Sequence, residues 1–415
     1  MQMQMQIIML LLTAFLLISS SSAGGLSPDY YSHSCPGAES IVAQTVSSKQ
    51  KANPTTAAGT LRLFFHDCFV TGCDASILIS HGSSSSERSS DINLSLPGDA
   101  FDLVVRAKAA LELRCPAQVS CADILTLATR DLVSILGGPF YPVLLGRKDS
   151  LFSRASDADS FLPRTNMSAS QLIRLFRTRG FSLQEMVALA GAHTVGFSHC
   201  KEFASRIYNY ENKGWGAVDP RLDMRFAKAL QRACANYLKD PTLSTFNDVM
   251  TPGRFDNVYY QNLRRGLGLL ASDSVLMADR RTRPFVLRYA SNQTLFFEDF
   301  AKVMQKLSLY GVKTGREGEV RRRCDSFNVG SKPFTLFVLF SFWSLSLFEL
   351  YYFLEDSNKN ITIYLQDLGG SQDQNLKKKG THKQLLLDCL DIKHQPRAKE
   401  KRGQREQRRL LKFFL

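Results

Sequence analysis

Apolar residues recur at helical spacing through most of the chain after its first two dozen residues. In residues 97–115 they fall every three or four positions, from Phe101 and Val104 to Leu113. Residues 120–139 open on Ser120, a good N-cap residue, with Asp123 in the capping-box position, and stop at Gly137-Gly138-Pro139. Both segments are predicted helices.

Three further segments follow the same pattern. Residues 168–182 predict a helix that ends at Gly180, and residues 182–196 open with Ser182 and Glu185, a second capping box. Residues 283–311 predict one or two more helices. Strand signals are few, the clearest at Tyr141–Leu145, and the Ser-rich stretch His81–Ser90 predicts a surface loop. The expected fold class is all-α.

The two ends of the chain differ from this body. Ile7–Ile18 is an apolar run followed by small residues up to Ala23, which predicts a signal peptide over 1–23; a buried first helix is the alternative. The globular domain is expected over 24–328. In the extension 329–415, the apolar run Phe334–Leu354 is long enough to span a bilayer, and basic residues follow it. A membrane anchor is one interpretation; translation through a retained intron is the favoured one.

Cysteine usage agrees with export. The chain has 415 residues and nine cysteines; eight lie between Cys35 and Cys324, an even set that predicts four disulfides, and Cys389 is left over. No C-x-x-C pair is present, which argues against a zinc ribbon. The formal net charge of +14 would favour acidic wall polysaccharide as a partner, and a nucleic-acid partner is not expected for an exported chain.

The stretch LRLFFHDCFVTGCDAS, Leu61–Ser76, concentrates reactive side chains. Arg62 and His66 are four residues apart, so a helix places them on one face, a permanent cation beside a group that transfers protons. Spacing alone also fits an exposed arginine and a core histidine. Next come Asp67, Asp74 and Ser76, oxygen ligands that suit calcium, in a loop that a Cys68–Cys73 bond would close. The alternative is an acidic turn without an ion.

A second histidine, His193, follows the Ala- and Gly-rich run MVALAGA. Small side chains let a flat ligand approach the backbone, and histidine is the usual proximal ligand of haem iron in peroxidases. Alone, such a residue is more often a core histidine. Of seven histidines, only His66 and His193 lie in well-patterned helical segments, which favours a pair that faces one cofactor.

These motifs closely resemble the secretory plant peroxidases, the class of horseradish peroxidase. The resemblance runs from about Leu26 to Cys324 and includes all eight framework cysteines. It implies a mostly helical fold whose distal and proximal halves enclose one haem b, with two calcium ions. It also implies a secreted enzyme that reduces hydrogen peroxide and oxidises phenolic donors by one-electron steps, with roles in peroxide removal, oxidative stress and lignin-type wall chemistry.

The resemblance assigns roles to matching residues. His66 would be the distal base, Arg62 its cationic partner and Phe65 the distal aromatic, with Asn93 orienting His66. His193 would be the axial ligand and Asp273 its partner, and Pro163 would border the donor channel. The implied distal calcium ligands are Asp67, Val70, Gly72, Asp74 and Ser76, and the proximal ones are Thr194, Asp248, Thr251, Arg254 (by its carbonyl) and Asp256. The implied disulfides are Cys35–Cys115, Cys68–Cys73, Cys121–Cys324 and Cys200–Cys234.

Some positions depart from the family pattern. Tyr141 stands where relatives usually have tryptophan, and Asn166-Met167 follows Pro163 where horseradish peroxidase has aromatics, so donor preference does not transfer. Asn166 and Asn292 are better glycosylation candidates than Asn93, whose proposed role needs burial. The rival hypothesis is a catalytically silent, calcium-stabilised wall-binding protein. The expected protein is a monomer that is extracellular or in the cell wall, with vacuolar or membrane-anchored forms as alternatives.

Overall fold

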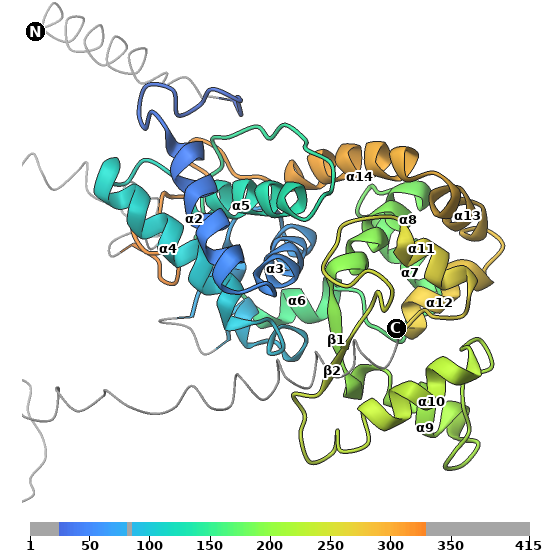
Figure 1. Ribbon diagram of the computed structural model, residues 1–415. Coiled ribbons are helices and arrows are strands. Elements are labelled where there is room, and N and C mark those ends of the chain that lie inside the picture. Colours follow the sequence, from blue (N-terminus) through green and yellow to red (C-terminus); the bar gives the residue numbers. More distant parts are fainter. Residues whose placement is uncertain (1–24, 81–84, 329–415) are drawn as a thin grey trace, which may run out of the picture. The chain divides into compact units, whose positions relative to one another are not determined.

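The computed structural model describes residues 25–80 and 85–328, and this part of the chain is mostly helical (Figure 1). The predicted signal peptide and the extension 329–415 lie outside it. The α-helices are α2 (Ala38–Ala52), α3 (Thr56–Val70), α4 (Gly98–Arg114), α5 (Cys121–Ile135), α6 (Ala155–Phe161), α7 (Ala169–Thr178), α8 (Leu183–Ala190), α9 (Ala204–Tyr208), α10 (Met224–Ala233), α11 (Val258–Arg264), α12 (Ala271–Ala278), α13 (Arg283–Ser291) and α14 (Gln293–Ser308).

Short 3₁₀ helices and one small sheet connect these helices. Strands β1 (Phe197–His199) and β2 (Ser244–Phe246) pair antiparallel with Ser198 opposite Thr245. The 3₁₀ helices are η1 (Ser76–Leu78), η2 (Glu87–Ser89), η3 (Asp91–Asn93), η4 (Gly191–Val195), η5 (Cys200–Glu202) and η6 (Tyr210–Asn212). Within the described residues no helix is long and apolar enough to cross a bilayer.

The helix starts confirm the capping predictions. Ser168 and Ser182 form complete capping boxes at α7 and α8. Ser120 accepts from the Asp123 N–H at the start of α5, but the Asp123 carboxylate accepts instead from the Tyr31 hydroxyl and pairs with Arg147. The Arg147–Asp123 pair is fully buried. A carboxylate that would cap a helix on the surface is used here to hold three segments together.

Two apolar cores organise the described residues. In the larger one, α3 packs against α4 and α5 on one side of the fold, and α8 packs against α14 and η4 on the other. The smaller core lies at α9 and α10, which are neighbours in Figure 1. Its buried residues include Phe203, Ile207 and Phe226. Because α3 also contacts η4 and α14, the two helical halves meet where α3 faces η4.

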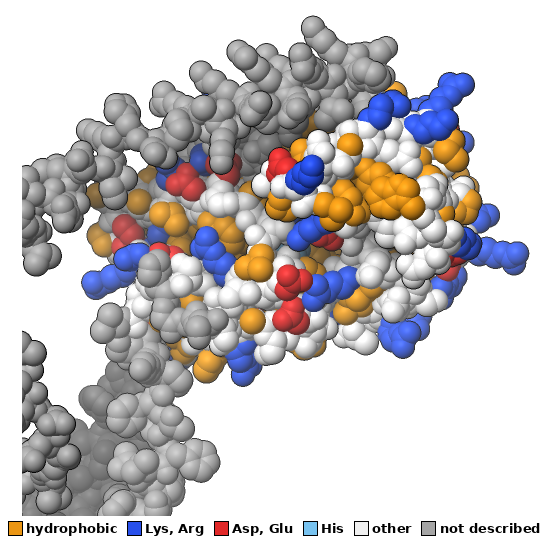
Figure 2. Space-filling view, turned by 90° about the horizontal axis from the view of Figure 1, so that it is seen from below, with side chains coloured by type: hydrophobic (Ala, Val, Ile, Leu, Met, Phe, Trp, Pro, Cys, Tyr) orange, Lys and Arg blue, Asp and Glu red, His pale blue; other side chains and the backbone are white. Residues whose placement is uncertain are grey.

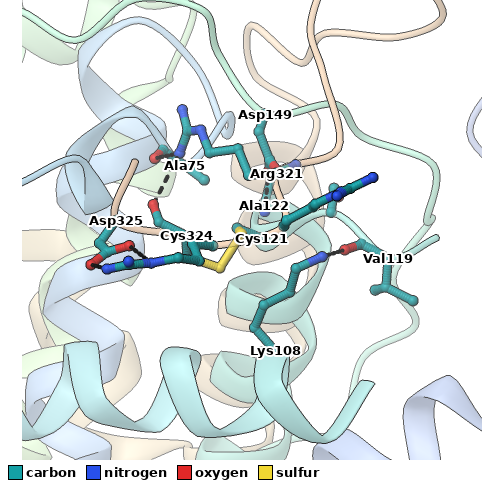
Figure 3. Close-up of a disulfide and its surroundings, with 12 residues drawn as sticks. Ala75, Lys108, Val119, Cys121, Ala122, Asp149, Arg321, Cys324 and Asp325 are labelled. Atoms are coloured by element: carbon teal, nitrogen blue, oxygen red, sulfur yellow. Dashed lines mark hydrogen bonds and ion pairs between the residues drawn. A yellow bond between two sulfur atoms is a disulfide. The ribbon is translucent and has the colours of Figure 1, made fainter. Parts of the chain in front are cut away.

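All four disulfides implied by the resemblance are present, Cys35–Cys115, Cys68–Cys73, Cys121–Cys324 and Cys200–Cys234. The Cys121–Cys324 bond ties the end of the domain to the start of α5 (Figure 3). Beside it the fully buried Arg321 donates to the Ala75 carbonyl, 2.7 Å away. The C-terminal segment is therefore fixed against the loop that follows α3.

Two expectations about irregular segments are wrong. Tyr141–Leu145 is not a strand, since only Leu145 pairs, in an isolated bridge with Ser27. The Ser-rich stretch is only partly a surface loop, because Ser86, Glu87 and Ser90 are at most 2 % exposed. Its end turns inward to support Asn93, as described below.

Candidate active site

A cavity of about 520 Å³ lies between α3 and η4. Its lining brings together the two histidines that the sequence singled out, His66 and His193, with Arg62, Phe65 and Pro163. Small-molecule and cofactor sites commonly occupy roughly 300–1,000 Å³ and are mostly apolar. Leu61, Ala190, Ala192, Leu276 and Leu307 are among the apolar residues that line this one. A flat, largely apolar cofactor with a metal at its centre fits a cavity with one imidazole on each side.

His66 is a neutral base held in one tautomer. Its Nδ1 lies 2.6 Å from the Asn93 Oδ1, and because an amide oxygen only accepts, Nδ1 carries the hydrogen. Nε2 then keeps its lone pair, and Arg62 Nε donates to it over 3.3 Å. Burial first, and the charge of Arg62 second, lower the pKa of His66 to about 3. The ring is therefore uncharged at neutral pH and can accept a proton.

Arg62 is fixed by the turn that also holds Asn93. Its guanidinium donates to the carbonyls of Ile92 and Ser95, at 3.0 and 3.2 Å, and to the Ser95 hydroxyl at 3.1 Å. Burial lowers its pKa to about 10, so it stays charged at neutral pH, and the carboxylate of Glu202 opposes the shift. The Asn93 amide donates to the Glu87 carbonyl over 2.7 Å, which orients its oxygen toward His66.

His193 has a charged partner. It lies in η4, just past the end of α8, instead of on the predicted helix itself. Its Nδ1 is 2.8 Å from Asp273 Oδ1, which leaves Nε2 available to the cavity. Burial is the largest single influence and would lower the pKa of His193, but the charge and the hydrogen bond of Asp273 together outweigh burial and raise the pKa. Asp273 also accepts from the Tyr259 hydroxyl at 2.9 Å and from the Leu270 N–H at 3.2 Å.

The small residues before His193 serve two purposes. Ala190 and Ala192 line the cavity, as expected for close approach of a flat ligand. Gly191 faces the opposite way, where an added Cβ would lie 2.4 Å from the Phe296 ring. The glycine therefore lets η4 pack on α14, a structural reason that the sequence did not reveal.

The implied distal calcium residues converge at the end of α3 and in the loop that follows it. Asp67 and Asp74 are buried beside each other, and burial, with the charge of Asp74 second, raises the pKa of Asp67 to about 8. Ser76 Oγ and one carboxylate oxygen of Glu87 are also buried there without a hydrogen bond of regular geometry. The Val70 carbonyl accepts from Arg179 at 2.6 Å and has a second lone pair free.

Gly72 in this loop has no room for a side chain. Its φ is 145°, and an added Cβ would lie 2.1 Å from the Gly311 carbonyl oxygen. Buried oxygens with unmet bonding capacity in a tight loop fit a hard cation such as calcium.

The implied proximal calcium residues also converge. Thr194 Oγ1 lies 3.2 Å from Asp248 Oδ2, 3.4 Å from the Arg254 carbonyl and 3.5 Å from Asp256 Oδ1. Thr251 Oγ1 joins the same two carboxylates, at 3.3 and 3.1 Å. No group of three or more His, Cys, Asp or Glu in the described chain is arranged to hold a metal, so each ion would need hydroxyl and carbonyl ligands as well.

Some contributors to the site carry no motif signal. Tyr259 donates to Asp273 and Ser95 accepts from Arg62, and each contact joins separate elements. Glu202 lines the cavity, and its charge acts on Arg62, from which it is distant in the sequence. Glu87 lies in the stretch interpreted as a surface loop. Tyr141 is buried, as a packing substitute for tryptophan requires, but its hydroxyl has no hydrogen-bond partner among the described residues.

Comparisons with known proteins find relatives along most of the chain. The profile of the family described as peroxidase matches residues 42–292. Peroxidase 31 of Arabidopsis thaliana is 57% identical over 304 residues, 73% of this chain and 94% of the relative. Peroxidase 63 of the same plant is 55% identical over 323 residues, 78% of this chain and 96% of the relative. Peroxidase 41 is 56% identical over 312 residues, 75% of this chain and 94% of the relative.

Proposed function

The chain belongs to the peroxidase family and is a haem enzyme that acts on hydrogen peroxide; on that premise we propose how its residues divide the work. The observation that carries the proposal is the arrangement around one cavity. A neutral His66, oriented by Asn93 and next to Arg62, lines the same cavity as His193, which is bonded to Asp273. Nothing in this set favours the silent wall-binding alternative.

On the distal side, His66 and Arg62 would act on hydrogen peroxide. His66 Nε2 accepts a proton from one peroxide oxygen and returns it to the other oxygen as that oxygen departs as water. Arg62, fixed by Ile92 and Ser95, stabilises the negative charge that develops on the departing oxygen. Phe65, which stacks on Phe69, forms an apolar wall beside them.

On the proximal side, His193 would hold the haem iron through Nε2. The Asp273 carboxylate fixes the other nitrogen and makes the imidazole a stronger donor. Haem supplies the two-electron reduction of peroxide, and two donor molecules restore those electrons one at a time.

We place the reducing donor at the cavity edge near Pro163. The lining there includes Pro163, Arg164, Thr165 and Glu202, and the Thr165 hydroxyl donates to Glu202 over 3.2 Å. A rim of hydroxyl, carboxylate and guanidinium groups suits small phenols with further hydroxyl groups.

The absorption spectrum of the holoenzyme tests the function directly. Addition of hydrogen peroxide should shift the Soret band, and phenols should return it to the resting position with turnover. A panel of phenols with and without a second hydroxyl group reads the donor preference. If the spectrum of the haem-loaded protein does not change when hydrogen peroxide is added, the proposal is contradicted.

We also propose a calcium ion in each of the two oxygen clusters. The support is that the proposed ligands of each ion converge. The carboxylate of Asp67, which follows His66 in the chain, accepts from the Ala75 N–H, between Asp74 and Ser76. Asp248 and Asp256 approach the hydroxyl of Thr194, which follows His193 in the chain. An ion that binds only the folded state stabilises it by mass action. If the melting curves of the holoenzyme with and without EGTA superimpose, the proposal of both calcium ions is contradicted.

We propose that the peroxidase domain ends at Asn328. Asn328 is bonded to the body through Glu319 and Val320, at 3.1 and 2.9 Å. Truncation after Asn328 should leave haem content and turnover unchanged, since both histidines and all eight framework cysteines precede it. Loss of activity would show that the extension is needed.

We also propose that the protein is secreted to the cell wall and acts there as a monomer. Figure 2 shows Lys and Arg side chains scattered over one face instead of gathered in a single patch. Binding to acidic polysaccharide would then depend on net charge and weaken steeply with salt. Size-exclusion chromatography and pectate binding at low and high salt test these points.

A further inference from the structure

Lys313 lies on the C-terminal segment that packs against the distal oxygen cluster. The Cys73 N–H donates to the Tyr310 carbonyl over 3.0 Å, and Gly311 lies in backbone contact with Gly72. The Lys313 carbonyl accepts from the Lys148 N–H at 2.8 Å. The backbone that carries this lysine is therefore fixed beside the loop.

The Lys313 ammonium group contacts the Asp74 carboxylate in an ion pair. Asp74 is fully buried, whereas the lysine side chain is 23% exposed. The two residues are 239 positions apart. A proposed ligand of calcium thus already has a cation bound to one of its oxygens.

The two arginines near the cluster donate hydrogen bonds to carbonyl groups and, among the described residues, form no ion pair with its carboxylates, although the charge of Arg321 acts on Asp67. Arg321 donates to the carbonyl of Ala75 (Figure 3) and to that of Ser150. Arg179 donates to the carbonyls of Phe69 and Val70. Among the ion pairs of the described residues, Lys313 alone pairs with a carboxylate of this cluster, while Asp67 has only backbone donors.

We propose that Lys313 is a built-in counter-ion of the distal calcium loop. It keeps the loop folded without calcium and makes the loop bind calcium more weakly than it would without the lysine. This inference rests on the proposed distal calcium site, which it deepens by naming the residue that sets its affinity.

The physical reason is competition between two cations for one carboxylate. A buried carboxylate without a partner destabilises the fold, and the ammonium group offsets that cost in the calcium-free protein. Calcium must then displace the lysine from Asp74 or bind beside its positive charge. Either way, part of the stabilisation that calcium would supply is already present, so the increment from calcium is smaller.

The proximal cluster provides an internal reference. Its carboxylates lie beside the hydroxyls of Thr194 and Thr251. Arg254 forms an ion pair with Asp256 at 3.7 Å, but the Arg254 side chain is 72% exposed. No described lysine pairs with either carboxylate there. Calcium removal should therefore affect the proximal cluster more.

The experiment compares Lys313→Met with the wild-type holoenzyme. Calcium chloride is titrated by calorimetry after EGTA treatment and dialysis, with magnesium chloride as a comparator, and melting curves are recorded with calcium and with EGTA. The distal phase is defined as the part of the calcium titration that is lost in the Asp74→Asn variant. Lys148→Met is the matched control, because Lys148 lies opposite Lys313 in the same backbone bridge and forms no ion pair with any described residue.

Lys313→Met should tighten the distal phase by about tenfold or more, as loss of a close like charge implies. It should also widen the gap between the calcium and EGTA melting temperatures. Lys148→Met and Lys313→Arg should behave as wild type. If Lys313→Met does not fold, Lys313→Gln, which keeps a polar head without charge, should give the same two shifts.

The outcomes separate this inference from the calcium site itself. A distal phase that appears only in Lys313→Met would support it strongly. A distal phase of equal affinity in wild type and variant would overturn it and leave the calcium site in place. If neither protein shows a distal phase, both the calcium site and this inference are overturned. If Lys148→Met shifts the distal phase as much as Lys313→Met does, the effect comes from the net charge of the protein, and the inference is overturned.

Discussion

The two histidines of the cavity have different partners at Nδ1, and their pKa values are shifted in opposite directions. His66 is bonded through Nδ1 to a neutral amide, Asn93, and lies next to the cation Arg62. His193 is bonded through Nδ1 to a carboxylate, Asp273, which a phenol, Tyr259, supports. Burial and Arg62 lower the pKa of His66 to about 3, whereas Asp273 raises the pKa of His193 against the effect of burial.

The difference shows how the partner at Nδ1 decides the role of Nε2. An amide oxygen fixes the tautomer without adding charge, so His66 remains a weak base that can take a proton and give it back. A carboxylate makes the imidazole electron-rich, which suits a permanent metal ligand. The predictions below exchange or remove these partners.

Removal of the distal base should have the largest effect. His66→Ala should bind haem but react with hydrogen peroxide about 10²–10⁴-fold more slowly, because proton transfer in this position is lost. Stopped-flow absorbance of the Soret band measures the rate. The exposed His33 gives the control, His33→Ala, which should react as wild type. A wild-type rate in His66→Ala would show that another group transfers the proton.

Removal of the proximal charge should act on the cofactor. Asp273→Asn keeps the size of the side chain but removes the charge that raises the pKa of His193. Loss of such a partner typically lowers metal affinity or activity by about 10–100-fold. Haem dissociation into excess apomyoglobin should accelerate, and the midpoint potential of the iron should rise. An unchanged dissociation rate and potential would mean that Asp273 only orients the ring.

Replacing the distal amide with a carboxylate should make the two histidines alike. In the wild type His66 stays neutral down to its pKa of about 3, so the peroxide reaction rate should be level from neutral pH to about pH 4. Asn93→Asp places a negative charge at Nδ1, which raises the pKa of His66 and moves the acid limb to higher pH. The pH profile of the stopped-flow rate checks this. Coincident acid limbs would mean that burial and the charge of Arg62 determine that pKa without a contribution from the residue at position 93.

The Tyr259 hydroxyl should have the smallest effect. Tyr259→Phe removes one of the hydrogen bonds that hold the Asp273 carboxylate. A hydrogen bond to a charged group contributes roughly 1.5–3 kcal/mol, and the Leu270 N–H remains. The midpoint potential should shift in the direction opposite to that of Asp273→Asn, because a less engaged carboxylate withdraws the His193 proton more strongly. A shift in the same direction would mean that Tyr259 mainly positions Asp273.

The helices and the two histidines could be predicted from the sequence because their signals are local. Arg62 and His66 are one turn apart on α3, and the boxes at Ser168 and Ser182 act within three residues. The pairing of the cysteines and the roles of the cavity residues came from a family resemblance, not from spacing. The disulfides are present as implied, and the roles remain the proposal tested above.

Where local signals were weak, the predictions were wrong. Tyr141–Leu145 has strand-like residues, but a strand needs a neighbour, and only Leu145 finds one. The Ser-rich stretch looks like a solvent-exposed loop, yet its end is buried, and there the Glu87 carbonyl accepts from the Asn93 amide.

By itself the sequence determined where helices begin, which histidines lie in patterned segments and which oxygen-rich loop follows His66, since each depends on residues a few positions apart. Only the tertiary structure decided what faces those groups. It placed Tyr259 against Asp273, and it placed Lys313 against Asp74 across 239 positions. Burial and the nearest charge determine a pKa or an ion affinity, and both are properties of the folded surroundings, which a one-dimensional pattern does not contain.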